Sequence, residues 1–556
     1  MKRCPECRRD YADDTLLYCL EDGTALVQGS VPSPNESQTA ILHNTSPPTN
    51  ADTGARSNST YADRSGWSST AGSSSRIISS ERISGTEAGR SIAVLPFRNI
   101  NKDGEDEYFC DGLTEEIISD LSAVKSLKVI SRASSMKLKG TDKDSRTIAA
   151  ELNVRYILDG SVRKAGDKIR ISAQLIDGLS DENLWANKYS GTLDDIFEIQ
   201  EKVSRSIVDA LKITLKPDEQ QKLEARDIEN PIAYDLYLKA RSEFVKGSPE
   251  ALDRAIDLLQ KGLEIIGDNE LILASLGYAH YHNFRWISKL DKDHLARAHE
   301  YMQRTFEFNP DASHGHVLKG LLAYSAGEMP EMIRSLRNAV EIDPTNPQAL
   351  FWLSINLNYV GSSESSRRLV DRLCELDPLQ AINIAVKAVG KVYAGEFEQA
   401  IPWIEKSLKM DPNSPLLIWT AAITEAWAGN DEKAVAQFDR LFEVAPNWIY
   451  TKHGLFQKYA MLGQKERALQ YNLPEMAEES KYDSHFALHM AECFAIIGEI
   501  DTAFEYLTLA VEHGLANVRF LGEHDRFLAG MRSDKRFGEI LRKAAVLVSR
   551  IEQLEL

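Results

Sequence analysis

The stretch EIDPTNPQALFWLSINLNYVGSSESSRRLVDRLCELDP, residues 341–378, sets the pattern for more than half of this chain. Pro344 and Pro378 lie 34 residues apart, and Gly361 stands midway between them. The same spacing continues on both sides, with prolines at Pro310, Pro412 and Pro446 and glycines at Gly327, Gly395, Gly429 and Gly463. Proline cannot continue a helix, and glycine favours a turn. We therefore predict a stack of antiparallel helix pairs, one pair for each period.

A third mark, usually a small residue, follows each glycine by five positions: Met332, Ser366, Ala400, Ala434 and Ala468. A fixed 34-residue period with these marks is the signature of tetratricopeptide (TPR) repeats, so residues 231–515 resemble that family. We expect about eight helix pairs there, a helical connector over residues 216–230 before them, and capping helices over residues 516–556 after them. Two departures interrupt the period: nine extra residues around 286–291 and a one-residue shift before Gly498.

The resemblance to TPR proteins implies a superhelix whose concave face, lined by the first helix of each pair, binds a peptide. Counting back from each turn glycine along one face of these helices selects candidates for partner binding. They are His314, Tyr324, Gln348, Asn358, Trp419, Tyr450, His453 and Gln457. The alternative for each is solvent exposure or packing against the next repeat. Apolar residues occupy the middle of the same face, so we expect a mixed groove that suits a partly apolar peptide.

Residues 91–215 follow a different pattern, which predicts an α/β domain with a partly antiparallel sheet. Residues 91–97 are apolar and rich in β-branched side chains, as in a buried strand. Residues 155–176 contain two segments of alternating polarity around an Ala-Gly-Asp turn, which predicts a hairpin. A helix is expected to open at Asp111.

Several motifs in this region carry a second resemblance. They are AVLPF at 93–97, FxDGLTE at 109–115, YxLxGSVR at 156–163 and LWA at 184–186. In this combination and order, residues 91–215 look like the TolB-like amino-terminal domain of bacterial proteins. That family precedes TPR arrays, often downstream of a kinase, a winged-helix DNA-binding domain or a nucleotide cyclase. The resemblance implies a non-catalytic domain for protein association.

The first 27 residues have the spacing of a small metal site. Cys4 and Cys7 form a CxxC knuckle, and Cys19 is followed by Asp22 where a zinc ribbon usually has its fourth cysteine. Zinc accepts a carboxylate oxygen, so these four side chains can complete a tetrahedron. Residues 1–27 resemble the zinc-ribbon heads of many bacterial proteins, and we predict structural zinc here. A decayed metal site or a redox CxxC is the alternative.

Composition and charge restrict the remaining choices. Residues 28–90 contain 15 serines and few apolar side chains, which predicts a disordered linker. The net charge is −18, and residues 216–556 account for −13 of it, which disfavours nucleic acid as a partner of the array. No apolar run reaches the ~20 residues that cross a membrane. The start lacks a secretory signal, and the six cysteines do not form a disulfide framework. We therefore expect a cytoplasmic protein.

The sequence thus predicts a multidomain, non-enzymatic scaffold that binds a protein or peptide partner through its TPR superhelix. No phosphate-binding loop or nucleophile–base pair is evident. His485 and His489 lie four residues apart without the glutamate of an HExxH motif, so no catalytic zinc is expected. The alternative function is a regulatory component of a bacterial kinase, nucleotide-cyclase or transcriptional pathway. A third possibility is nucleic-acid binding through residues 1–27.

Overall fold

The computed structural model describes residues 2–3, 10–11, 27–28, 90–101, 106–192, 195–224, 227–246, 248–287 and 291–553. The chain divides into two compact units, residues 1–81 and 82–556. Within the first unit, β1 (Lys2–Arg3) pairs antiparallel with β2 (Asp10–Tyr11) and β3 (Val27–Gln28). The predicted zinc ligands Cys4, Cys7, Cys19 and Asp22 lie outside the described residues, as does nearly all of the predicted linker.

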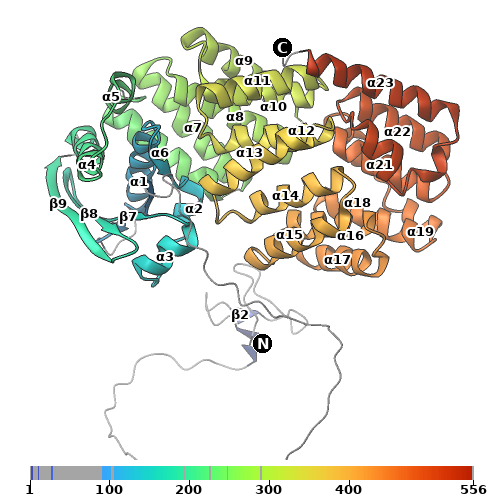
Figure 1. Ribbon diagram of the computed structural model, residues 1–556, viewed down its shortest axis with the longest axis horizontal. Helices are drawn as coiled ribbons and strands as arrows, with labels where there is room; N and C mark the ends of the chain where they lie inside the picture. The colour runs from blue at the N-terminus through green and yellow to red at the C-terminus, as the bar shows by residue number, and fades with distance from the viewer. Residues whose placement is uncertain are drawn as a thin grey trace, which may run out of the picture. The chain divides into compact units, whose positions relative to one another are not determined.

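The second unit begins with an α/β domain. Its elements are β4 (Ser91–Val94), β5 (Arg98–Asn99), α1 (Glu107–Ser122), β6 (Lys128–Val129), α2 (Arg132–Met136), α3 (Ser145–Leu152), β7 (Tyr156–Ala165), β8 (Lys168–Asp177), β9 (Glu182–Thr192) and α4 (Ile196–Ala210). The sheet order is β6-β4-β7-β8-β9, with β5 also paired to β7. Strand β4 is parallel to both of its neighbours, β6 and β7. Strands β7, β8 and β9 are antiparallel and lie side by side in Figure 1.

Successive residues of β4 and β7 point to opposite faces of the sheet, and each face packs in its own hydrophobic core. Ile92 and Leu158 face a cluster that includes residues of α1 and α4, whereas Ala93 and Ile157 face a cluster that includes residues of α3. Both faces of the sheet are therefore covered where β4 and β7 pair, as period-two alternation requires. The helix that was expected to open at Asp111 begins four residues earlier, at Glu107.

After α5 (Pro217–Glu224), the described chain is almost entirely helical. The helices are α6 (Pro231–Lys246), α7 (Pro249–Ile266), α8 (Glu270–His282), α9 (Lys292–Phe308), α10 (Ser313–Ser325), α11 (Met329–Ile342), α12 (Pro347–Tyr359), α13 (Ser363–Leu376), α14 (Ala381–Tyr393), α15 (Phe397–Met410), α16 (Pro415–Trp427), α17 (Asp431–Val444), α18 (Ile449–Met461), α19 (Lys465–Leu469), α20 (Pro474–Glu479), α21 (Ser484–Ile496) and α22 (Ile500–Glu512). Successive helices pack in pairs, from α6 with α7 to α21 with α22.

The turn inside each regular pair is made by glycine in the left-handed region. Its φ angle lies between 70° and 84° at Gly327, Gly361, Gly395, Gly429, Gly463 and Gly498. Glycine adopts this conformation without the steric cost that a Cβ atom adds. The helix pairs and their glycine turns confirm the predicted TPR-like stack of antiparallel helices.

Two pairs depart from the regular form. In the second pair, a π-helix, η2 (Asn283–Ile287), continues from α8 at the predicted insertion. In the seventh pair, the second helix is broken into α19 and α20, and Pro474 opens the second piece. Proline suits the first turn of a helix but not its interior, so the break falls where the sequence places Pro474.

Beyond α22, the chain forms η3 (Phe520–His524), η4 (Ala529–Met531) and α23 (Lys535–Glu552). Helix α23 packs on α22 and buries Phe537, Ile540 and Ala544, while Leu541 and Val548 are half-buried. Among the described residues, no helix is long and apolar enough to span a bilayer.

The α/β domain docks on the array at two separate places. Helix α1 packs against α6, where Arg241 forms an ion pair with Glu115 at 2.5 Å. Farther along the array, Ser134 Oγ of α2 donates to Asp377 Oδ1 at 2.5 Å and accepts from the Leu379 N–H at 2.8 Å. The domain therefore bridges the first helix pair and the loop after the fourth (Figure 1).

Candidate functional site

The inner face of the array is filled by its own side chains. The His485 ring of α21 stacks on Tyr359 at 5.0 Å between ring centres, and lies 6.0 Å from Tyr393 and 5.7 Å from Trp419. These three aromatic residues come from α12, α14 and α16, and each is at most 7% exposed. Helices from the fourth to the eighth pair therefore converge on one buried aromatic cluster.

Six of the eight predicted groove residues are buried. Tyr324, Asn358, Trp419, Tyr450, His453 and Gln457 are each at most 7% exposed. They are therefore packed between neighbouring helices, which is the alternative considered for each of them, rather than open on a groove. Of the other two, His314 is exposed and Gln348 is half-buried. Partner binding by this pair stays a prediction.

Several of the six have partners within the chain. Trp419 Nε1 donates to His453 Nδ1 at 3.4 Å, and Tyr450 Oη donates to Asp483 Oδ2 at 3.2 Å. Tyr324 Oη donates to the other oxygen of Asp483 at 2.8 Å. These side chains link the inner helices to the start of α21, which is a structural role.

A buried ion cluster surrounds Asp483. Arg285 of η2 lies 2.7 Å from Glu479 and 3.4 Å from Asp483, and all three side chains are at most 10% exposed. Burial alone would raise the pKa of Asp483, but Arg285, His485 and the Phe486 N–H hold it below its usual value. Burial raises the pKa of Glu479, against the opposing effect of Arg285. The cluster ties the second helix pair to the junction before the eighth.

A second polar cluster lies deeper in the interior. His489 Nδ1 is 2.9 Å from Glu492 Oε2, and Trp427 Nε1 donates to Glu492 Oε1 at 2.9 Å. Burial raises the pKa of Glu492 to about 8 and lowers that of His489 to about 3. Burial and the neighbouring Glu492 also raise the pKa of Asp525. Because His489, Glu492 and Asp525 are fully buried, no substrate reaches them, and acid–base catalysis here is not supported.

The chain closes this interior with residues 513–532, called here the C-terminal segment. It crosses the ends of successive first helices: the Ala516 N–H donates to the Tyr359 carbonyl at 2.8 Å, and Asn517 Nδ2 donates to the Asn358 and Tyr393 carbonyls at 3.0 and 3.1 Å. Arg526 donates to the Ala426 carbonyl at 3.2 Å. The segment therefore donates hydrogen bonds to carbonyls at the C-terminal ends of these helices, two of which, those of Asn358 and Ala426, also accept from the turn glycines.

A small cavity of about 230 Å³ lies among α1, α4, α5 and α6. Glu116, Asp120, Glu201 and Asp227 line it beside apolar side chains that include Phe197. Burial and the nearby carboxylates of Glu115 and Asp120 raise the pKa of Glu116 to about 8. Asp120 accepts from Ser204 Oγ at 2.8 Å, so part of this acidic set has a structural role.

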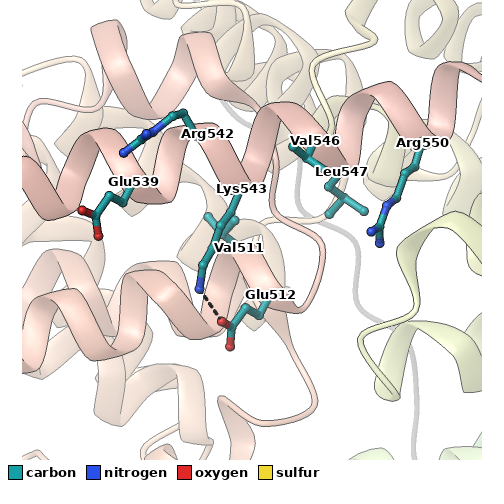
Figure 2. A pocket seen from close by; sticks show the side chains of 8 residues that line it. All are labelled: Val511, Glu512, Glu539, Arg542, Lys543, Val546, Leu547 and Arg550. Carbon is teal, nitrogen blue, oxygen red and sulfur yellow. Dashed lines mark hydrogen bonds and ion pairs between the residues drawn. The ribbon is translucent and has the colours of Figure 1, made fainter.

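An open groove lies on the outer side of the last two helices. It has a volume of about 480 Å³ and is lined by Val511 and Glu512 of α22 and by Glu539, Arg542, Lys543, Val546, Leu547 and Arg550 of α23 (Figure 2). Val546 is 56% exposed, although it is a large apolar side chain. Lys543 Nζ forms an ion pair with Glu512 at 2.8 Å. Sequence reasoning had counted α23 only as a cap and did not consider this second face.

One family model matches within the α/β domain, and a longer stretch of the chain matches a bacterial protein. Residues 88–205 match the family model of the second domain of HilA/YgeH-like transcriptional regulators. A protein of Rhizobium meliloti (strain 1021) named "Putative adenylate cyclase 3" is 40% identical over 233 residues, which are 42% of this chain and 40% of that protein. This chain therefore matches two fifths of the length of that relative, and the activity in its name does not transfer with the match.

Two solved structures show weaker similarity. A tetratricopeptide repeat protein from Parabacteroides merdae ATCC 43184 is 15% identical, with a TM-score of 0.30, over 49% of this chain and 99% of that chain. TolB from Acinetobacter baumannii is 20% identical, with a TM-score of 0.18, over 22% of this chain and 28% of that chain. Both scores are too low to support an argument. The TPR assignment rests on the chain's own helix pairs, and the TolB-like resemblance stays a prediction.

Proposed function

We propose that this protein is a non-enzymatic scaffold whose array binds a protein partner along its outer edges. The supporting observation is that the loop after the fourth helix pair already binds a folded domain. Leu379 packs against the α3 side of the α/β domain, next to the hydrogen bonds of Ser134. At the same repeat position stand Asp311, Thr345, Asn413 and Asn447, which are all polar.

The same edge continues with apolar side chains that the described chain leaves exposed. Met410, Leu416, Phe442 and Val444 are between 37% and 46% exposed. They come from the ends of α15 and α17 and the start of α16, and Arg440 Nη2 donates to the Pro412 carbonyl between them. Apolar patches on a rigid repeat surface are typical of protein interaction sites.

Within this proposal, residues 91–215 are a TolB-like docking domain and residues 1–27 a zinc-binding head. The donor set of Cys4, Cys7, Cys19 and Asp22 suits zinc, which would be structural because four protein ligands leave no open position. Metal analysis of the full chain and of Asp22→Ala tests this part: we expect one zinc in the parent protein and a marked loss in the variant. A parent protein without zinc would remove the metal from the proposal.

The relatives named above also support a signalling role as the second candidate. The family model is described as a domain of transcriptional regulators, and the relative is named "Putative adenylate cyclase 3". The region shared with this chain would then be the part that receives or docks a regulatory partner. Cross-linking to a kinase, a cyclase or a transcription factor would favour this candidate over a general scaffold.

Capture of partners should use the full chain, because the array is not an independent unit. One hydrophobic core runs from α1 and α4 into α6, α7 and α8, so an array cut at residue 231 would expose it. We expect native cross-linking to recover a defined protein with the parent chain and much less with Met410→Asp/Phe442→Asp. His314→Ala/Gln348→Ala tests the remaining inner-face candidates in the same experiment. A parent chain that recovers no protein above a mock-tagged control would contradict the proposed function.

A further inference from the structure

We propose that the groove between α22 and α23 binds an acidic amphipathic helix of a protein partner; this rests on the scaffold function proposed above. The groove residues of α23 are Glu539, Arg542, Lys543, Val546, Leu547 and Arg550. Their spacing repeats every three or four positions, so they form one continuous stripe along the helix. The buried stripe, which includes Phe537, Ile540 and Ala544, is a different face.

The charge of α23 contrasts with the rest of the chain. This helix has five basic and two acidic residues, whereas the whole chain has a net charge of −18. Lys543 is already paired with Glu512, and within the described part of the chain Arg542 donates to the Gly538 carbonyl of its own helix, at 3.3 Å. Arg550 is exposed at the far end of the groove (Figure 2). Two guanidinium groups are therefore positioned to receive carboxylates, with which they pair in bidentate geometry.

The spacing of these groups describes the partner. Arg542 and Arg550 are eight residues apart, which is about 12 Å along a helix. Val546 and Leu547 lie between them along the helix, and the buried Val511 of α22 also lines the groove. A complementary helix would therefore present two carboxylates about two turns apart, with aliphatic side chains between them. A basic helix would place its cations against the two arginines and is disfavoured.

A synthetic helix tests this directly. The probe is a labelled, helix-forming peptide with glutamates eight positions apart and leucines between them, titrated into the full chain by fluorescence anisotropy. We expect saturable binding that weakens with added salt. Arg542→Glu/Arg550→Glu should weaken it at least ~10-fold, and Val546→Asp should do the same by removing the apolar contact. Arg519→Glu reverses one charge at a 71% exposed site outside the groove and should leave binding unchanged.

The most direct test reverses the charges of both the peptide and the groove. The same peptide with lysines in place of its glutamates should bind the Arg542→Glu/Arg550→Glu variant better than it binds the parent chain. No binding of the glutamate peptide to the parent chain, or equal binding by the double variant, would overturn the proposal. A dimer of the parent chain that Val546→Asp dissociates would instead assign the groove to a second copy. Cross-linked partners that survive the double variant would leave the scaffold function standing while this groove fails.

Discussion

Individual buried residues decide what the inner face of this array can do. Histidines, a glutamate and an aspartate gather around Trp427, but burial keeps them from any substrate. His489 and Glu492 are the nearest pair, at 2.9 Å, and both are fully buried. Their protonation still affects the protein, because it changes when the chain unfolds.

Glu492 should make stability depend on pH between neutral and mildly basic conditions. Folded Glu492 keeps its proton up to about pH 8, whereas an unfolded glutamate loses it near pH ~4.3. The stability that this carboxyl contributes is thus complete below the unfolded pKa and is lost as pH rises through 8. Glu492→Gln cannot ionise, so its melting temperature should fall less than that of the parent chain between pH 7 and 9.

The buried histidines do not change the stability of the protein between pH 7 and 9. Burial lowers the pKa of His453, His485 and His489, so their contribution is present above the unfolded value of about 6.5 and is lost only as pH falls. Glu539→Gln, at an exposed site, is the matched control and should follow the parent curve. Parallel curves for Glu492→Gln and the parent chain would show that Glu492 is ionised in the fold.

Comparing alanine substitutions at two turn glycines measures how tightly the C-terminal segment packs on the array. Gly395 and Gly498 have φ angles of 78° and 80°, so alanine meets the same backbone strain at both, about 1–2 kcal/mol. A Cβ at Gly395 would lie 2.6 Å from the His524 ring, whereas a Cβ at Gly498 meets nothing within 4 Å. Gly395→Ala should therefore lower the free energy of unfolding by a further ~1–3 kcal/mol. Equal losses in urea unfolding would mean that His524 does not pack on this turn.

Two elements depart from the regular repeat, the π-helix η2 and the broken second helix of the seventh pair, and they contact each other. The π-helix η2 carries Arg285, and the broken second helix of the seventh pair ends just before Asp483. The insertion and the break therefore meet in one buried ion cluster that closes the superhelix. Sequence reasoning located both departures from the period, but it had no means of showing that segments about 195 residues apart are in contact.

Removing Arg285 should be costly. Arg285→Met leaves Glu479 and Asp483 buried without their counter-charge, which is expected to lower the free energy of unfolding by ~3–5 kcal/mol. Arg519→Met breaks an exposed pair with Glu523 and should cost at most ~1 kcal/mol. Chemical unfolding of both variants decides the point. Similar small losses would indicate that the carboxylates are hydrated or protonated rather than held by Arg285.

At the scale of the whole molecule, the α/β domain and the C-terminal segment act as two braces on the array. The domain holds the array at α6 and at the loop after α13, through Arg241 and Asp377. The segment holds the ends of α12, α14 and α16. The array is therefore braced on two sides rather than free to change its curvature.

The docking of the domain can be tested at Leu379. Leu379→Asn restores the polar character that other repeats have at this position, and it removes apolar contact with the cluster around α3. We expect faster hydrogen exchange in α2 and α3 and a loss of ~1–3 kcal/mol in stability. Leu416→Asn, at a 40% exposed apolar site, is the control and should change neither. Unchanged exchange in Leu379→Asn would contradict docking at this loop.

Structural features that depend on residues close together in the sequence could be predicted, whereas features that depend on distant segments could not. The period fixed by Gly361 and its equivalents is local, so the helix pairs and their turns could be predicted. Whether the side chains of Trp419, Tyr450 and Gln457 are accessible depends on the curvature of the superhelix. It also depends on the C-terminal segment, which crosses the ends of the inner helices. Neither is encoded in one repeat. Leu379 is apolar at a position that is polar in the other repeats. This difference could have indicated from the sequence that the α/β domain packs there.

The chain's own C-terminal segment lies across the ends of the inner helices, and the proposed function therefore places partners on the outer surfaces of the array. Hydrogen exchange of the full chain, read at residues 516–528, tests it most directly. Ala516, Phe520 and Leu521 are fully buried; the Ala516 amide donates to the Tyr359 carbonyl of the array, and the amides of Phe520 and Leu521 donate to Asn517. We expect this segment to exchange as slowly as α14 and α16. Exchange as fast as that of exposed loops would contradict it, because the inner face would then be open to a peptide.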